Sequence, residues 1–355
     1  MRPNGATPIS KGRTAVIPAR SSRAALWRSG KGMGRQPFST RRQEFPDACP
    51  EKVFVPRVVV AGASGLIGRA LVAALRAQGV DVARLARPPV DVDEIAWDPR
   101  TGYLDPDVFD GVHAVVNLAG RSLAKWPWTR RARADILASR VRSTRLLVDT
   151  MARGDARPAV LISASAIGYY GDRGDEVLTE SSQPGGGFLA TVTRPWEAEA
   201  RRASARGTRV VCPRFGMVLA RRGGAMGSLL PPFRFGVGGS LGGGRQWWSW
   251  VHLDDVVDAI QAAITTPWLD GPVNVVAPAA VQNREFTRVL AAVLHRPAFL
   301  PVPAFALRLV LGAMAETVLS SQRVQPAKLQ AARFRFRWPE LRPALENLLA
   351  PGTGH

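Results

Sequence analysis

The sequence predicts an α/β protein in which a doubly wound parallel sheet carries a smaller C-terminal substrate-side region. Between Val58 and Leu219, short runs rich in β-branched residues alternate with segments of helical periodicity. Such alternation favours right-handed crossovers and a parallel sheet that is covered by helices on both faces. The first apolar run also leads directly into three glycines spaced three apart, in "VVVAGASGLIGRAL".

The expected strands and helices follow one another in a regular order. We expect strands at residues 57–62, 81–87, 114–120, 159–166 and 209–219, and helices at 66–79, 131–154 and 195–207. Gly79 is expected to end the first helix, because glycine is favoured just beyond a helix C-terminus. Beyond Leu219 the alternation stops and a glycine- and aromatic-rich stretch begins, "PPFRFGVGGSLGGGRQWWSWVHLDDVVDAI".

Three segments are expected along the chain. Residues 1–50 form a basic tail that lacks hydrophobic periodicity and is expected to be disordered. Its composition is that of an organelle transit peptide, but a start codon placed too far upstream gives the same appearance, and we prefer this second interpretation. An α/β domain is assigned to 51–220 and a smaller C-terminal region to 221–350, from which Asp254–Ala263 and Asn274–Ala277 are expected to return to the α/β core.

Composition limits the possible partners. The chain has 355 residues, of which 46% are hydrophobic, and no apolar run is long enough to span a membrane. Half of the net charge of +20 comes from residues 1–43, and no basic cluster is interleaved with aromatic residues. Cys49 and Cys212 are too few for a disulfide framework or a cysteine-built metal site. We therefore expect a cytoplasmic protein with no nucleic-acid or membrane partner and no metal.

The glycine pattern predicts a dinucleotide site. In such a turn Gly62 permits a tight bend, Gly65 lets the backbone approach a pyrophosphate, and Gly68 lets the helix pack against the sheet. The helix N-terminus adds unpaired N–H groups and a positive dipole, which favour an anion. The alternative is a tight strand–helix connection with incidental glycines.

The end of the second strand indicates which dinucleotide is bound. A protein that binds NAD usually places a carboxylate there to accept a hydrogen bond from the ribose 2′-hydroxyl. This sequence has Ala86 and then Arg87, whose guanidinium suits a 2′-phosphate. NADP is therefore the predicted cofactor, and a solvated arginine is the alternative.

Several longer motifs carry a resemblance to a known family. The stretches "VVNLAG", "LISASAIGYYG" and "WSWVHLDD" resemble the extended short-chain dehydrogenase/reductase superfamily. More closely, the chain resembles an atypical branch of NAD-dependent epimerase-like, or sugar-nucleotide epimerase family, proteins. Matching motifs run from about Val58 to Leu349 and include "WDPRTGYLD" and "FRWPELRPAL". The resemblance implies a Rossmann-type domain that carries NADP and a small C-terminal region on the substrate side.

The resemblance also implies which residues contact the cofactor. They lie in the glycine turn, at the ends of the second and third strands, on the following helix and after "VVCPRF": Gly62, Ser64, Gly65, Leu66, Ile67, Gly68, Ala86, Arg87, Leu118, Ala119, Gly120, Asp135, Arg140 and Gly216. Each has a plainer alternative. Leu118 and Ala119 could be core residues at a strand end, and Asp135 and Arg140 could lie on a solvated helix face.

The catalytic pair of the superfamily is missing. Short-chain dehydrogenases use a Tyr with a Lys four residues on, yet none of the three tyrosines here is followed by Lys at that distance. Leu189 and Thr193 stand near the two positions instead. Ser165 matches the superfamily's Ser, and Tyr169 beside Arg173 is a possible substitute base. Ser165 and Tyr169 are therefore the catalytic candidates.

Further ionisable candidates are Lys125, Glu180, Glu197 and His252, and of these His252 fits a structural role better. Together the residues and the resemblance predict an NADP-binding oxidoreductase or epimerase that acts on a small hydroxylated or nucleotide-linked substrate. The alternative is a non-catalytic NADP-binding regulatory protein. The oligomeric state is left open.

Overall fold

A parallel sheet of eight strands forms the centre of the computed structural model, which describes residues 57–87, 94–221 and 223–350. The expected tail, residues 1–50, lies outside the described residues. Across the sheet the order is β3 (Glu94–Ala96), β2 (Asp81–Ala86), β1 (Arg57–Ala61), β4 (Ala114–Asn117), β5 (Val160–Ser163), β8 (Arg209–Phe215) and β12 (Gly271–Val275), and β6 (Ser165–Ala166) also pairs with β8. The strand order reverses between β1 and β4, and open α/β sheets bind ligands at such a switch point. The predicted Rossmann-type doubly wound sheet is confirmed.

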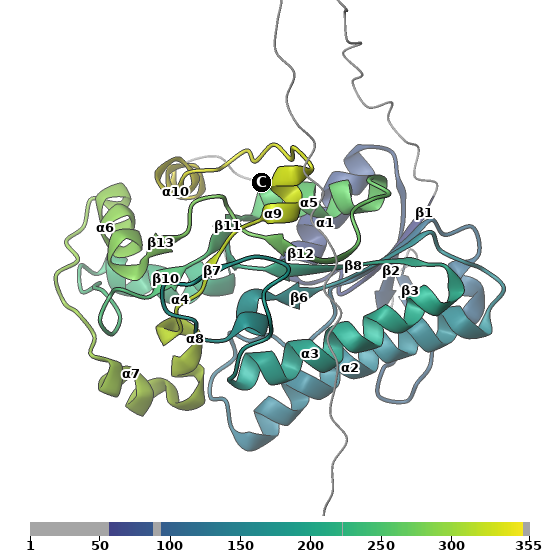
Figure 1. Ribbon diagram of the computed structural model, residues 1–355, viewed down its shortest axis with the longest axis horizontal. Helices are drawn as coiled ribbons and strands as arrows, with labels where there is room; N and C mark the ends of the chain where they lie inside the picture. Colours follow the sequence, from purple (N-terminus) through teal and green to yellow (C-terminus); the bar gives the residue numbers. More distant parts are fainter. Residues whose placement is uncertain (1–56, 88–93, 222, 351–355) are drawn as a thin grey trace, which may run out of the picture. The chain divides into compact units, whose positions relative to one another are not determined.

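Helices cover both faces of the sheet (Figure 1). In β1, Val58 and Val60 pack toward α1 (Leu66–Ala77) and α5 (Leu253–Thr265), while Val59 faces the opposite core with α2 (Arg130–Arg153). α3 (Phe188–Arg201) runs beside α2 on that second face. Alternate residues of a strand point to opposite faces, so a strand between two helical layers must be apolar throughout. The continuous run "VVV" meets this requirement.

Two predicted elements differ from the structure. The helix predicted from residue 195 begins at Phe188, so Pro195 lies inside α3, which ends at Arg201 and continues as the 3-10 segment η3 (Arg202–Arg206). A residue far away in the sequence stabilises this extension of the helix, because the Glu316 carboxylate accepts a hydrogen bond from the Phe188 N–H at 3.1 Å. The strand predicted at 209–219 is divided at Gly216 into β8 and β9 (Met217–Leu219).

The C-terminal region has a core of its own, built around Trp250 and Phe286. Its helices are α4 (Gly224–Arg234), α6 (Asn283–Leu294), α7 (Ala304–Leu311), α8 (Ala315–Leu319), α9 (Ala327–Ala331) and α10 (Leu341–Leu349). Its short strands form three pairs, β9 with β11 (Trp250–His252), β10 (Trp247–Trp248) with β13 (Val281–Gln282), and β7 (Val177–Leu178) with β14 (Arg323–Val324). The chain also returns to the main domain, because α5 packs against α1 and β12 pairs with β8.

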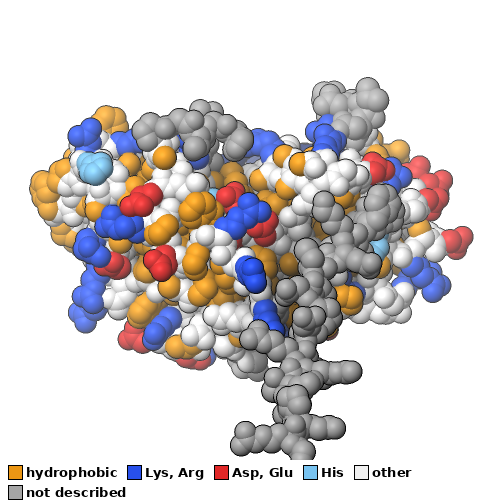
Figure 2. All heavy atoms as spheres, turned by 90° about the horizontal axis from the view of Figure 1, so that it is seen from above, with side chains coloured by type: hydrophobic (Ala, Val, Ile, Leu, Met, Phe, Trp, Pro, Cys, Tyr) orange, Lys and Arg blue, Asp and Glu red, His pale blue; other side chains and the backbone are white. Residues whose placement is uncertain are grey.

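The face shown in Figure 2 carries basic and acidic side chains that are interspersed with apolar ones. Several of the ion pairs on the surface join neighbouring turns of one helix, such as Arg288 with Glu285. Among the residues that the structure describes, no helix combines the length and the hydropathy that crossing a bilayer requires.

Candidate cofactor and substrate site

The glycine turn between β1 and α1 is tightly packed on one side. Gly62 has φ 80°, and a Cβ there would lie 2.6 Å from the carbonyl carbon of Leu118 and 2.8 Å from the nitrogen of Ala119. A side chain at Gly68 would overlap the Gly62 carbonyl oxygen and lie 2.8 Å from the Ala63 Cα. The lack of a side chain at Gly68 therefore lets the first turn of α1 pack directly against the glycine turn. The sequence had predicted that this glycine lets the helix pack against the sheet.

The other side of the turn is open. Gly65 is the N-cap of α1 and provides no side-chain cap, and Ser64 and Gly65 are both exposed. The N–H groups of Leu66, Ile67 and Gly68 lie in the first helical turn, where the helix offers them no acceptor, and no acidic residue lies in this turn. This cradle of N–H groups fits a pyrophosphate.

The end of β2 presents a free arginine. Arg87 directly follows Ala86, is exposed, and forms no ion pair within the described part of the chain. Arg84, by contrast, pairs with Glu94 of β3 at 3.0 Å. Arg87 is thus available for an anionic group at the edge where an adenosine ribose would lie.

The end of β4 is held by side chains of α2. Asn117 donates from Nδ2 to Thr144 at 2.8 Å and accepts from the Ala119 N–H at 3.2 Å. The buried Arg140 guanidinium covers Gly120, donates to the Arg121 carbonyl at 3.0 Å, and lies 5.1 Å from the Trp196 ring. Burial lowers the pKa of Arg140 to about 10, so it remains charged at neutral pH.

The two residues of α2 that were assigned to the cofactor therefore have different environments. Arg140 is not on a solvated face, whereas Asp135 is partly exposed and pairs with Arg121 at 3.0 Å.

Ser165 belongs to a buried polar network. Its hydroxyl donates to Glu197 Oε1 at 2.7 Å, and Arg214 holds the same carboxylate through Nε and Nη2 at 2.8 and 2.9 Å. Arg214 also donates to the Tyr170 hydroxyl at 2.9 Å, which donates to Asn274 at 2.7 Å. Because the Ser165 proton is directed at Glu197, this oxygen can offer only lone pairs to another group.

Tyr169 lies under a different arginine from the one that the sequence indicated. The Arg214 guanidinium is 3.5 Å from the centre of the Tyr169 ring. Arg173 instead forms a two-point ion pair with Glu176 at 2.7 and 2.8 Å. Among the described residues Arg173 is thus engaged elsewhere, and its activation of Tyr169 stays a prediction. The neighbouring Tyr170 is fully buried, and its burial raises its pKa to about 12.

The remaining ionisable candidates have structural contacts. His252 caps α5 by accepting the Asp254 N–H on Nδ1 at 3.1 Å, and burial lowers its pKa, so it is neutral at pH 7. Glu180 accepts from the backbone N–H groups of Asn274 and Lys328 at 3.0 and 3.1 Å. Lys125 is exposed. Within the described residues, no group of His, Cys, Asp and Glu is arranged to hold a metal ion.

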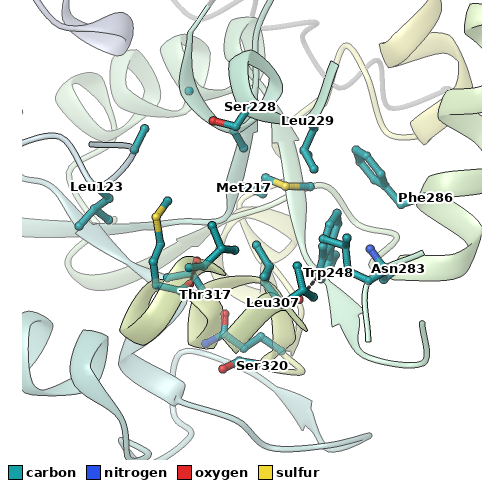
Figure 3. A pocket seen from close by; sticks show the side chains of 18 of the residues that line it. Leu123, Met217, Ser228, Leu229, Trp248, Asn283, Phe286, Leu307, Thr317 and Ser320 are labelled. Carbon is teal, nitrogen blue, oxygen red and sulfur yellow. Dashed lines mark hydrogen bonds between the residues drawn. The ribbon is translucent and has the colours of Figure 1, made fainter. Parts of the chain in front are cut away.

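A pocket of about 830 Å³ adjoins these elements (Figure 3). It extends from Ala166–Gly168 and Gly216, at the carboxyl ends of β6 and β8, to α4, α6 and α7 of the C-terminal region. Gly224 of α4 lines it, and a Cβ at this glycine would lie 3.2 Å from the Leu66 side chain of the glycine turn. The pocket and the pyrophosphate cradle are thus neighbours. Ser165 and Tyr169 are not among its lining residues.

Comparison with known families agrees with this architecture. The model of the NAD dependent epimerase/dehydratase family matches residues 58–276. The chain belongs to this family. Residues 302–348 match a second model, a domain of unknown function called DUF1731, which covers α7 to α10. The resemblance to an atypical, epimerase-like short-chain dehydrogenase/reductase is confirmed.

Individual relatives cover nearly the same length. The epimerase family protein Mb2239 of Mycobacterium bovis is 42% identical over 290 residues, which are 81% of this chain and 96% of the relative. The crystal structure of human epimerase family protein SDR39U1 with NADPH has a TM-score of 0.75 and 32% identity, covering 82% of this chain and 98% of that chain. A nucleoside-diphosphate sugar epimerase from Corynebacterium glutamicum has a TM-score of 0.69 and 35% identity, covering 83% and 58%.

The sequence did not predict two parts of the site, the buried polar network and the aromatic lining of the pocket. Arg214 and Tyr170 of the network were not predicted as site residues, although an arginine inside the apolar run "VVCPRFGMVL" indicates a charge that must be paired when buried. The aromatic lining of the pocket was visible only as a tryptophan-rich stretch, with no indication of what it faces.

Proposed function

We propose that this protein is an NADP-dependent oxidoreductase or epimerase whose small-molecule substrate reacts in the pocket beside the glycine turn. The observation that carries the proposal is the contact between these two sites, where Gly224 of the pocket lies against Leu66 of the cradle. Bound NADPH would supply a hydride for the reduction of a carbonyl group, whereas in epimerisation bound NADP+ would take a hydride from a carbinol carbon and return it to the opposite face of the resulting carbonyl. The NADPH in the human SDR39U1 structure supports this choice of cofactor.

Different residues of the protein would bind different parts of the cofactor. The first-turn N–H groups of α1 would hold the pyrophosphate, and Arg87 would pair with the 2′-phosphate. Leu118, Ala119 and Gly120 would lie along the cofactor, and Gly216 would border the nicotinamide. At Gly216 a Cβ would lie 2.6 Å from the Ser249 carbonyl oxygen, so a side chain does not fit. A cytoplasmic location is part of the proposal, and it rests on the cysteine usage.

A non-catalytic NADP-binding role is the second candidate. It is favoured by the absence of a Tyr-x-x-x-Lys pair from the sequence and by the commitment of the Ser165 proton to Glu197. Oxidation of NADPH by carbonyl compounds in the presence of the protein would exclude this role. Tight NADPH binding without turnover, together with a protein partner whose affinity depends on NADPH, would favour it.

The cofactor assignment is tested with Arg87→Glu. The variant should bind NADPH at least about tenfold more weakly and change NADH binding little, since hydrogen bonds to a charged group contribute roughly 1.5–3 kcal/mol. Both affinities can be measured by fluorescence titration. Arg100→Glu is the matched control, because Arg100 is also exposed but lies in a turn beyond β3. A wild type that prefers NADH, or equal losses for both cofactors, would contradict the assignment.

A further inference from the structure

The pocket differs from the site that the family's sugar-nucleotide relatives suggest, because its walls are apolar. Met217, Leu229, Trp248, Phe286 and Leu307 point into it (Figure 3). None of the described lining residues is Asp, Glu, Lys, Arg or His. Even Arg308, which follows Leu307 in α7, is not among them.

The polar atoms that do line the pocket are largely occupied by the protein itself. Four tryptophans line it, and three of their indole N–H groups donate inside the fold: Trp128 to Leu123 at 3.0 Å, Trp247 to Asp175 at 2.7 Å and Trp248 to Val318 at 3.2 Å. These three indoles therefore present ring surface to the pocket.

Three of the lining hydroxyls, and one polar atom of each lining amide, are also engaged. Thr317 and Ser320 donate to helix carbonyls at 2.7 Å each, and Ser249 donates to the Gln322 carbonyl at 2.7 Å. The Asn283 side-chain oxygen accepts from Leu241 at 2.8 Å, and the Gln322 amide donates to Gly171 at 3.0 Å.

A small number of neutral groups is left for a ligand. Within the described chain they are the Ser228 and Thr287 hydroxyls, the Trp126 indole N–H, the Asn283 side-chain NH2, the Gln322 side-chain oxygen and the proton of the Ser122 hydroxyl, whose oxygen accepts from the Ala124 N–H.

The absence of charged residues from the described lining argues against a highly polar, charged ligand on energetic grounds. A nucleoside diphosphate sugar has two phosphate charges and several hydroxyls, and each must exchange water for a protein partner on entering. A polar group that is buried without such a partner loses roughly 1–3 kcal/mol, and an unpaired charge loses more. The few free groups of the lining cannot compensate for these losses. An apolar ligand, in contrast, gains free energy from every part of this surface.

We infer that the pocket takes an uncharged, predominantly apolar molecule with one or two oxygen functions, such as a long-chain or polycyclic ketone or alcohol. The assignment of a reacting oxygen rests on the proposed oxidoreductase function. That end of the ligand lies at Ala166–Gly168 and Gly216, where the pocket meets the sheet. The apolar body extends between α4, α6 and α7.

The mouth of the pocket fits the same ligand class. The large lining side chains that are well exposed mark the opening, and they are Trp126 at 61%, Val237 at 53% and Val310 at 64%. The polar lining residues Ser122 and Ser228 are exposed as well. An apolar molecule therefore meets hydrophobic surface before it enters.

Binding can be measured separately from turnover. We would titrate the NADPH-loaded protein with methyl ketones from 2-hexanone to 2-decanone and with UDP-glucose, using tryptophan fluorescence and calorimetry. Affinity should rise about fourfold with each methylene that is buried. UDP-glucose should show no binding at millimolar concentration. The same ketones are then assayed for NADPH oxidation.

Matched variants locate the binding site. Leu229→Gln, in the pocket wall, should weaken 2-decanone binding at least tenfold, and Leu309→Gln, on the outer side of α7, should change it less than twofold. Val310→Gln is a second pocket variant at an exposed position that tolerates a polar side chain, and it should also weaken binding.

The outcomes distinguish the inferred ligand class from the proposed oxidoreductase function on which it rests. Binding that depends on chain length without NADPH oxidation would support the ligand class and contradict the oxidoreductase proposal. Preferential binding of UDP-glucose would overturn the ligand class and leave that proposal standing. A flat dependence on chain length, equal effects of Leu229→Gln and Leu309→Gln, or binding of neither ligand class would also overturn the inference.

Discussion

The buried ion pair between Arg214 and Glu197 predicts a large loss of stability when its negative charge is removed. The two side chains are 2% and 0% exposed and are joined by hydrogen bonds of 2.8 and 2.9 Å. Burial alone would lower the pKa of Arg214, but the hydrogen bonds and charge of Glu197 raise it above its usual value. Glu197→Gln keeps the shape and leaves the guanidinium charged, so breaking the pair should cost about 3–5 kcal/mol.

Urea unfolding followed by tryptophan fluorescence measures this loss. Glu199→Gln is the matched control, since Glu199 lies two residues further along the same helix and pairs with Arg145 and Arg202, which are 54% and 50% exposed. Exposed pairs contribute only about 0.2–1 kcal/mol. The prediction therefore requires Glu197→Gln to lose several times more stability than Glu199→Gln.

A double variant tests the cause. Adding Arg214→Met to Glu197→Met should recover part of the loss, because no unpaired charge then remains in the core. Equal losses for Glu197→Gln and Glu199→Gln, or strictly additive losses in the double variant, would refute the reasoning.

Two further predictions concern the glycine turn and the buried thiol. Gly68→Ala places a Cβ against the Gly62 carbonyl, so it should lower the free energy of unfolding by about 1–3 kcal/mol and weaken NADPH binding at least tenfold. Gly186→Ala is the control, because nothing lies within 4 Å of a Cβ there, and it should match the wild type in thermal melting and in NADPH titration. Burial raises the pKa of Cys212 from 9.0 to about 12, so the unfolded thiol ionises first and stability falls as pH rises through this interval. The contribution lost by pH 10 is about 1.4 kcal/mol, and Cys212→Ala should reduce the difference between urea unfolding at pH 8 and pH 10 by that amount. A loss of NADPH affinity in Gly186→Ala, or an unchanged alkaline slope in Cys212→Ala, would contradict the corresponding assignment.

The sequence alone determined the fold class, the order of the main strands along the chain and the family. These features depend on local patterns, since a strand between two helical layers must be apolar throughout, as Val58–Val60 are, and a helix closing on a tight turn requires glycine at Gly68. The motifs that carry the family resemblance are contiguous in the same way. The individual cofactor contacts and the roles of Ser165 and Tyr169 remain predictions.

The tertiary structure decided features that join distant parts of the chain. Glu316 fixes the start of α3 from 128 residues away, which local propensity around Pro195 could not predict. Ser165 and Arg214 meet on Glu197, and this shared carboxylate decides where the serine proton points. The pocket combines residues from the ends of β6 and β8 with helices of the C-terminal region. Its apolar character was not visible in the sequence because hydrogen bonds within the fold, rather than residue types, determine which polar atoms remain free for a ligand.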